Sequence, residues 1–130
     1  MSEVNALENI RWKVNDPLGS EIYLKENNFI WHIVGRHDSK DAEIRAKIEP
    51  QAKFTVEHPR FIIRDIQAAG RVKYLSLADV QDDVKITIRT IAVVVDENGE
   101  VVTWFARRTI NDILEKEGVI YDDRNHNLQI

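Results

Sequence analysis

An unbroken run of strand signals in the second half of the chain constrains the fold most. Residues 84–89 alternate apolar and polar side chains, which is typical of a β-strand with one face in solvent. Residues 91–95 are all apolar, so the same strand is expected to enter a region that is covered on both faces. Asn98-Gly99 then supplies the positive φ of a tight turn, and residues 101–106 return as the partner strand. The sequence therefore predicts a long β-hairpin.

Two further strands are expected upstream of this hairpin. Residues 60–65 and 72–77 are rich in branched and aromatic side chains, and Gly70 lies in the connection between them. Four successive strands with short connections favour an antiparallel meander. Residues 21–25 fit either a short strand or an arm, and the rest of the first thirty residues do not distinguish helix from strand.

Two helices are predicted beside the strands. Asp38 or Ser39 caps a helix that runs to about Glu49, and Pro50 follows its end. A second helix begins at Thr109 and presents one apolar face. The expected fold class is α+β, with helices packed on one side of a four-stranded antiparallel sheet.

Length and composition exclude several classes of protein. A chain of 130 residues fits a single domain, and 43% hydrophobic residues supply enough apolar mass for a folded core. Cysteine is absent, which excludes disulfides, thiol catalysis and cysteine-ligated zinc. The sequence holds no apolar run long enough to span a bilayer and no apolar signal core, so we expect a cytoplasmic protein without membrane contact.

The charges are unevenly distributed along the chain. The net charge of −4 argues mildly against a nucleic-acid partner. However, residues 29–75 carry a net positive charge and three of the four histidines, and residues 101–108 are also positive. The acidic residues are concentrated elsewhere. The net charge therefore does not exclude a partner that bears phosphate.

The most informative polar motif contains His32, Arg36 and His37. A histidine exchanges a proton near neutral pH, and an arginine binds phosphate or carboxylate through two donors. Together they suit phosphoryl-transfer chemistry. A histidine beside Trp31 is equally consistent with a structural role in packing. A metal site is not expected, because His-Glu-x-x-His is absent, and the chain has neither a glycine-rich phosphate loop nor Gly-x-Ser-x-Gly.

The order of these motifs resembles the phage-encoded nuclease domains that are grouped with barnase, EndoU, colicin-type RNases and RelE (BECR fold). The pattern comprises His-Ile-x-x-Arg-His at residues 32–37, a helix ending at Pro50, strands bearing arginine and tyrosine, and Val-Val-Thr-Trp-Phe at residues 101–105. It covers residues 29–117 and leaves residues 1–28 as an N-terminal extension of the single domain. The resemblance implies N-terminal helices packed on a four-stranded antiparallel sheet, as in barnase and RelE, with a C-terminal helix.

The same resemblance implies a metal-independent endoribonuclease without a cofactor, in which the RNA 2′-hydroxyl attacks its own phosphate. His32 or His37 would be the general acid or base, and Arg36 would bind the phosphate. Thr103 would contact the phosphate or orient a catalytic group. The weaker candidates for substrate binding come from adjacent strands: Tyr74, Trp104, Arg107 and Arg64.

RNA, for example tRNA or mRNA, is the expected partner, together with a protein inhibitor or a phage partner. Trp104 stands where many relatives have a small residue, so its ring would either close the site or stack on a base. The acidic ends are unusual for a free RNase. A second interpretation is a catalytically inactive relative, toxin-like or phage-associated, that acts as a protein-binding module. A third is RNA binding without cleavage.

Overall fold

The computed structural model describes residues 9–35, 37–65, 68–81, 85–107 and 118–124. In chain order, its elements are β1 (Ile10–Asn15), β2 (Glu21–Lys25), α2 (Glu26–Asn28), the π-helical segment η1 (Phe29–Val34), α3 (Ser39–Lys47), α4 (Glu49–Glu57), β3 (Phe61–Arg64), β4 (Val72–Gln81), β5 (Ile86–Val95), β6 (Val101–Arg107) and β7 (Val119–Asp122). β1 and β2 form a two-stranded sheet. The other strands form a five-stranded antiparallel sheet in the order β6-β5-β4-β3-β7.

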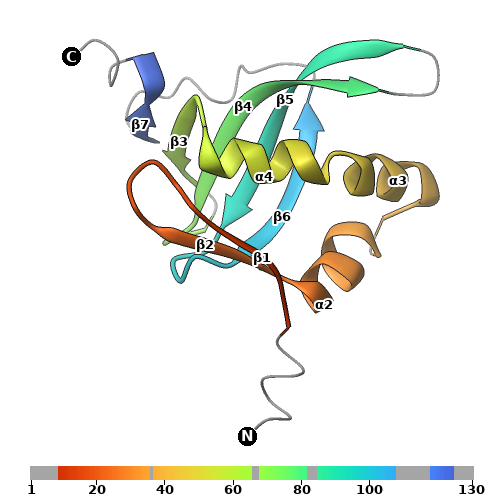
Figure 1. The fold of residues 1–130 in the computed structure, drawn as a ribbon, viewed down its shortest axis with the longest axis horizontal. Helices are drawn as coiled ribbons and strands as arrows, with labels where there is room; N and C mark the ends of the chain where they lie inside the picture. The colour runs from red at the N-terminus through yellow and green to blue at the C-terminus, as the bar shows by residue number, and fades with distance from the viewer. Residues whose placement is uncertain (1–8, 36, 66–67, 82–84, 108–117, 125–130) are drawn as a thin grey trace, which may run out of the picture.

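β5 and β6 form the long hairpin that the sequence predicts. Thr90 pairs with Arg107 and Val94 pairs with Thr103, and Gly99 takes a φ of 92° in the turn. β3, β4 and β5 pair antiparallel in sequence order, which confirms the expected meander. β4 and β5 continue beyond the strands beside them as a projecting pair (Figure 1).

The expected fold class is wrong, because the chain does not place N-terminal helices on a four-stranded sheet. Its first described element is the β1–β2 hairpin, in which Trp12 and Val14 are half-buried and alternate with exposed polar side chains. β7 pairs with β3 as a fifth strand of the main sheet. The barnase- and RelE-like arrangement is therefore not the observed one. The predicted C-terminal helix from Thr109 lies outside the described residues.

The helix predicted after Asp38 is confirmed, and a second helix follows it directly. The Asp38 carboxylate caps α3 by accepting hydrogen bonds from the N–H groups of Lys40 and Asp41. α3 ends at Lys47, and Pro50 lies in the first turn of α4. Proline is tolerated there because its missing N–H would have no acceptor within the helix. In the sequence, Pro50 indicates only the end of the first helix, and α4 is not predicted.

The main core lies on the face of the large sheet that α4 and the β1–β2 hairpin cover (Figure 1). Ala52 and Val56 of α4 and Ile22 and Leu24 of β2 are buried there against Val93 of β5. A smaller cluster contains buried side chains of the opposite face, namely Phe61, Ile63, Leu75 and Ala92. The N-terminal hairpin is thus part of the main hydrophobic core.

A buried hydrogen bond fastens the β1–β2 turn to the main sheet. The Tyr74 hydroxyl donates to Asp16 Oδ2 at 2.5 Å, and Asp16 Oδ1 accepts the N–H groups of Leu18 and Ser20. Both side chains are buried. Burial, and then the hydrogen bond to Asp16, raise the pKa of the Tyr74 hydroxyl. Tyr74 therefore stays neutral and holds the Asp16 carboxylate of the turn through its hydroxyl hydrogen.

The Tyr74→Phe variant tests this link. It removes a hydrogen bond to a charged group, so we expect the free energy of unfolding to fall by about 1.5–3 kcal/mol. Urea denaturation near neutral pH measures the change. Tyr121→Phe is the matched control, because its hydroxyl lies 3.3 Å from Asp123 in a long contact and the loss should be smaller. Equal effects of the two substitutions would contradict the assigned role.

Alkaline pH should weaken the same link. The pKa of Tyr74 is higher in the folded protein than the ordinary value of 10.0, so the unfolded chain loses this proton first and stability falls as the pH rises above that value. Tyr74→Phe lacks this titration. The difference in unfolding free energy between wild type and variant should therefore narrow at pH values above about 10. If the difference in unfolding free energy between wild type and Tyr74→Phe stayed constant with pH, the titration of Tyr74 would not contribute to stability.

Candidate functional site

A groove of about 660 Å³ lies where η1 and the segment before α3 meet the edge strand β6. Its lining residues come from several elements and their connections: Asn28, His32, His37, Arg71, Asp96, Glu100, Val102 and Thr103. Three residues that the sequence analysis proposed as catalytic therefore line one groove, although they come from distant parts of the chain. These are His32, His37 and Thr103.

His32 lies on η1, which is anchored to the rest of the protein on its inner side. Ile33 is fully buried, and the Phe29 ring packs against Trp104 with 5.8 Å between ring centroids. Asn28, immediately before η1, donates from Nδ2 to two carbonyl oxygens at the start of β6. These contacts hold the segment against β6, and the exposed His32 lines the groove. Short π-helical segments of this kind often occur at functional sites.

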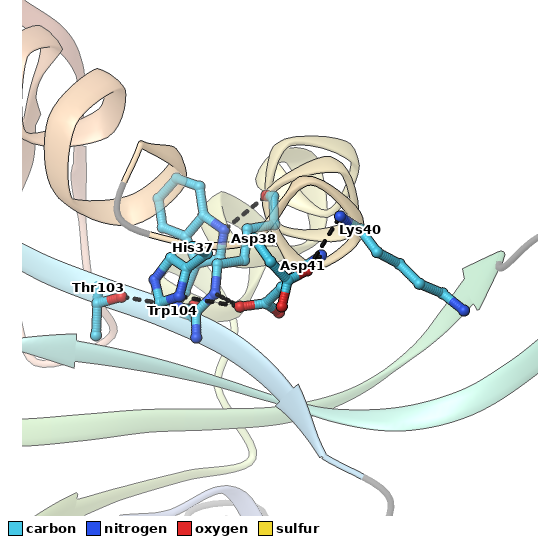
Figure 2. A network of polar contacts seen from close by, with 7 residues as sticks. His37, Asp38, Lys40, Asp41, Thr103 and Trp104 are labelled. Carbon is cyan, nitrogen blue, oxygen red and sulfur yellow. Dashed lines mark hydrogen bonds and ion pairs between the residues drawn. The ribbon is translucent and has the colours of Figure 1, made fainter.

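His37 is linked to β6 through a chain of polar contacts (Figure 2). His37 Nδ1 lies 3.0 Å from Asp41 Oδ2, and Arg45 Nε donates to the same oxygen at 3.1 Å. Arg45 Nη1 donates to Thr103 Oγ1 at 3.0 Å and to the Trp104 carbonyl oxygen at 2.6 Å. The Trp104 indole N–H donates back to the Arg45 carbonyl oxygen at 2.9 Å. One imidazole and the threonine hydroxyl therefore belong to a single network of polar contacts.

The fixed charges that line the groove are of both signs. Arg71 contributes a cation, and Asp96 and Glu100 contribute carboxylates. Asp96 Oδ1 accepts the N–H groups of Asn98 and Glu100 within the β5–β6 turn. A Glu100 carboxylate oxygen lies 3.5 Å from Lys25 Nζ. Each carboxylate therefore already interacts with nearby N–H groups or with a lysine. These interactions offset part of the repulsion between the carboxylates and an anion in the groove.

The other residues predicted to bind substrate do not line the groove. Trp104 is fully buried, so it cannot stack on a base. Tyr74 is buried against the β1–β2 turn. Arg107 lies over the Phe105 ring, with its guanidinium carbon 4.6 Å from the ring centroid, further along β6 than the groove residues. Arg64 is exposed at the end of β3.

Arg36 lies outside the described residues, so its contact with phosphate stays a prediction. Asp41 and Arg45 are additions that the sequence analysis missed. A signal for them was present, because His37, Asp41 and Arg45 follow one another at intervals of four residues. That spacing places Asp41 and Arg45 on one face of the predicted helix, and His37 lies just before its cap at Asp38 or Ser39.

Comparisons with protein-family models and with curated proteins find no match for this chain. In the part of the chain that the structure describes, no three histidine, aspartate or glutamate side chains are grouped so as to hold a metal ion. No helix formed by the described residues is long and apolar enough to cross a membrane. The function therefore has to be argued from the groove and its residues.

Gly35 offers a test of how η1 is held. A Cβ at this position would lie 2.5 Å from the Ile30 carbonyl oxygen. Gly35→Ala should therefore displace η1 and lower the free energy of unfolding by about 1–3 kcal/mol, which urea denaturation measures. Gly118→Ala is the matched control, because a Cβ there meets only ordinary contacts, the nearest at 3.8 Å. If Gly35→Ala and Gly118→Ala had the same free energy of unfolding, the close packing at Gly35 would not contribute to stability.

Proposed function

We propose that this protein is a metal-independent endoribonuclease, in which the 2′-hydroxyl of RNA attacks the adjacent phosphate. The observation that carries the proposal is the presence of two imidazoles in one groove with a hydrogen-bonded threonine hydroxyl. Imidazole is the side chain that most readily exchanges a proton near neutral pH. The reaction requires one proton to be removed and one to be supplied, and the groove offers one imidazole for each transfer.

The reaction needs no nucleophile from the protein. One imidazole takes the proton of the 2′-hydroxyl as its oxygen forms a bond to phosphorus. The other imidazole gives a proton to the 5′ oxygen as the bond between phosphorus and that oxygen breaks. The products are a 2′,3′-cyclic phosphate end and a 5′-hydroxyl end. The lack of cysteine and of a serine in a nucleophile motif is compatible with this chemistry.

The phosphate would be held by donors along the groove. Thr103 can donate its hydroxyl hydrogen to a phosphate oxygen, because its Oγ1 already accepts from Arg45. Arg71 supplies a guanidinium that lines the same groove. Arg36 remains a predicted phosphate ligand, since it neighbours His37 in the sequence. Such donors stabilise the negative charge that develops on the non-bridging oxygens.

The likeness of residues 29–117 to phage-encoded nucleases supports the proposal at the level of motifs. The observed fold gives it no further support, because the N-terminal hairpin and the five-stranded sheet differ from the expected architecture. Under this proposal the protein acts in the cytoplasm on RNA such as tRNA or mRNA. A protein inhibitor or phage partner would then control its activity.

A second candidate function is a catalytically inactive protein-binding module. It is favoured by the exposure of Trp31 and Ile30, whose side chains are 65% and 44% accessible beside His32 in η1. Exposed large apolar side chains next to one another often mark a contact surface. Under this alternative, binding to the partner protein would require Trp31 but neither of the two histidines.

RNA cleavage assays distinguish the two functions. The purified protein should cleave RNA in the presence of EDTA and leave 2′,3′-cyclic phosphate ends. His32→Ala and His37→Ala should each reduce the rate at least ~100-fold, because each removes a proton-transfer group. His58→Ala is the matched control, since this exposed histidine packs on Phe54 of α4 and does not line the groove. It should cleave at the wild-type rate.

Two results would contradict the nuclease proposal. One is a wild-type protein that leaves tRNA and mRNA intact under these conditions. The other is cleavage of an RNA that carries a 2′-deoxy sugar at the scissile position, since that substrate lacks the attacking hydroxyl. Loss of cellular activity in Trp31→Ala but not in His37→Ala would instead support the protein-binding module.

A further inference from the structure

We propose that Asp41 is a positioning residue that orients His37 and makes it the base of the reaction, with His32 as the acid. This inference rests on the proposed endoribonuclease function. It assigns separate roles to two imidazoles that the sequence treats alike. The assignment follows from which nitrogen of His37 meets a carboxylate.

Asp41 contacts one specific nitrogen of the His37 ring. Its Oδ2 lies 3.0 Å from His37 Nδ1. A carboxylate only accepts hydrogen bonds, so in the neutral imidazole Nδ1 carries the hydrogen and Nε2 carries the lone pair. Which nitrogen of a histidine is protonated is set by the hydrogen bond that the other nitrogen makes. The contact therefore prepares Nε2 of His37 to accept a proton.

Asp41 is held through both its main chain and its carboxylate. Its backbone N–H donates to Asp38 in the cap of α3, which fixes the first turn of the helix. Its Oδ2 accepts from Arg45 Nε at 3.1 Å. Arg45 is largely buried, with 14% of its side chain exposed, and it donates to Thr103 Oγ1 and to the main chain of β6. Asp41 thus cannot turn away from His37 without losing its hydrogen bond with Arg45, which is itself held by β6.

Apart from Asp41 and Arg45, the charged side chains of α3 make their contacts away from His37, which leaves Asp41 as the carboxylate for this role. The Lys40 side chain extends away from the network (Figure 2). Glu43 pairs with Lys47 at 3.2 Å on the exposed part of the helix. Among the carboxylates of the described part of α3, only Asp41 has a recorded contact with His37.

With these roles, the proton transfers can be assigned to atoms. Nε2 of His37 takes the proton of the 2′-hydroxyl as the new bond from that oxygen to phosphorus forms. His32 gives its proton to the 5′ oxygen as the bond from phosphorus to that oxygen breaks. The Asp41 carboxylate stabilises the imidazolium that forms on His37. The Thr103 hydroxyl, held by Arg45 at the other end of the network, lies in the same groove as both imidazoles.

The tautomer of His37 can be measured in wild-type protein. Long-range 1H–15N spectra of the uniformly 15N-labelled full chain, recorded at a pH where imidazoles are neutral, distinguish the Nδ1–H from the Nε2–H form. The His37 signals are assigned from their loss in His37→Ala. We expect His37 in the Nδ1–H form. An Nε2–H form would overturn the inference, whatever the protein does to RNA.

Kinetics of RNA cleavage by variants test the functional half of the inference. Asp41→Ala should lower kcat about 10- to 100-fold with little change in KM, because loss of an orienting partner has effects of that size. It should also release His37 from the pure Nδ1–H form. Glu43→Ala is the matched control, since it removes a carboxylate from the same helix without touching His37. It should leave both kcat and the tautomer unchanged.

The outcomes separate this inference from the proposed function. Wild-type kcat in a folded Asp41→Ala variant overturns the positioning role while the nuclease function stands. Absence of cleavage by the wild-type protein overturns the nuclease function and the base role together. If Asp41→Ala does not fold, the wild-type tautomer still decides, because an Nε2–H form of His37 contradicts the positioning role of Asp41.

Discussion

The burial of Trp104 is the constraint on which the rest of the structure depends. Its ring is fully covered, lies 6.3 Å from the Trp12 ring of β1 in a stacked arrangement, and packs on Phe29 of η1. Its main-chain oxygen and indole N–H exchange hydrogen bonds with Arg45 of α3. One residue of β6 thus joins the N-terminal hairpin, the π-helical segment and α3 to the large sheet. A smaller side chain would leave a cavity where all three meet.

This anchorage also explains why the candidate site lies at the edge of the sheet. An edge strand carries main-chain groups without a strand partner, and proteins commonly cover them with other segments. In β6, carbonyl oxygens at the edge accept from Asn28, which immediately precedes η1, and from Arg45 of α3. The segments that cover the edge are therefore the ones that carry His32 and His37. The segments that protect the edge of β6 therefore also form the groove.

Strand periodicity predicts much of the large sheet, because it is a local property of the sequence. Alternation in residues 84–89 and the turn at Gly99 place the β5–β6 hairpin correctly. Alternation shows which side chains share a face but not which face another element covers. Trp104 and Tyr74 are therefore predicted at a substrate surface and lie in the core. Residues 21–25 fit a strand in the sequence and form β2, whereas β1 is not recognised because it has only two half-buried side chains, Trp12 and Val14.

The candidate site, like the large sheet, can be predicted from the sequence only where it depends on local spacing. The spacing of His37, Asp41 and Arg45 can be recognised in the sequence, whereas their connection to Thr103 depends on how α3 packs on β6. Net charge is a whole-chain sum, but a bound phosphate responds mainly to charges within the screening length of about 8–10 Å. Arg45 is already paired with Asp41, so among the described residues that line the groove Arg71 is the arginine available to a phosphate. Under the proposed function, recognition of RNA would therefore depend on short-range contacts, because the net charge of −4 opposes the approach of a polyanion.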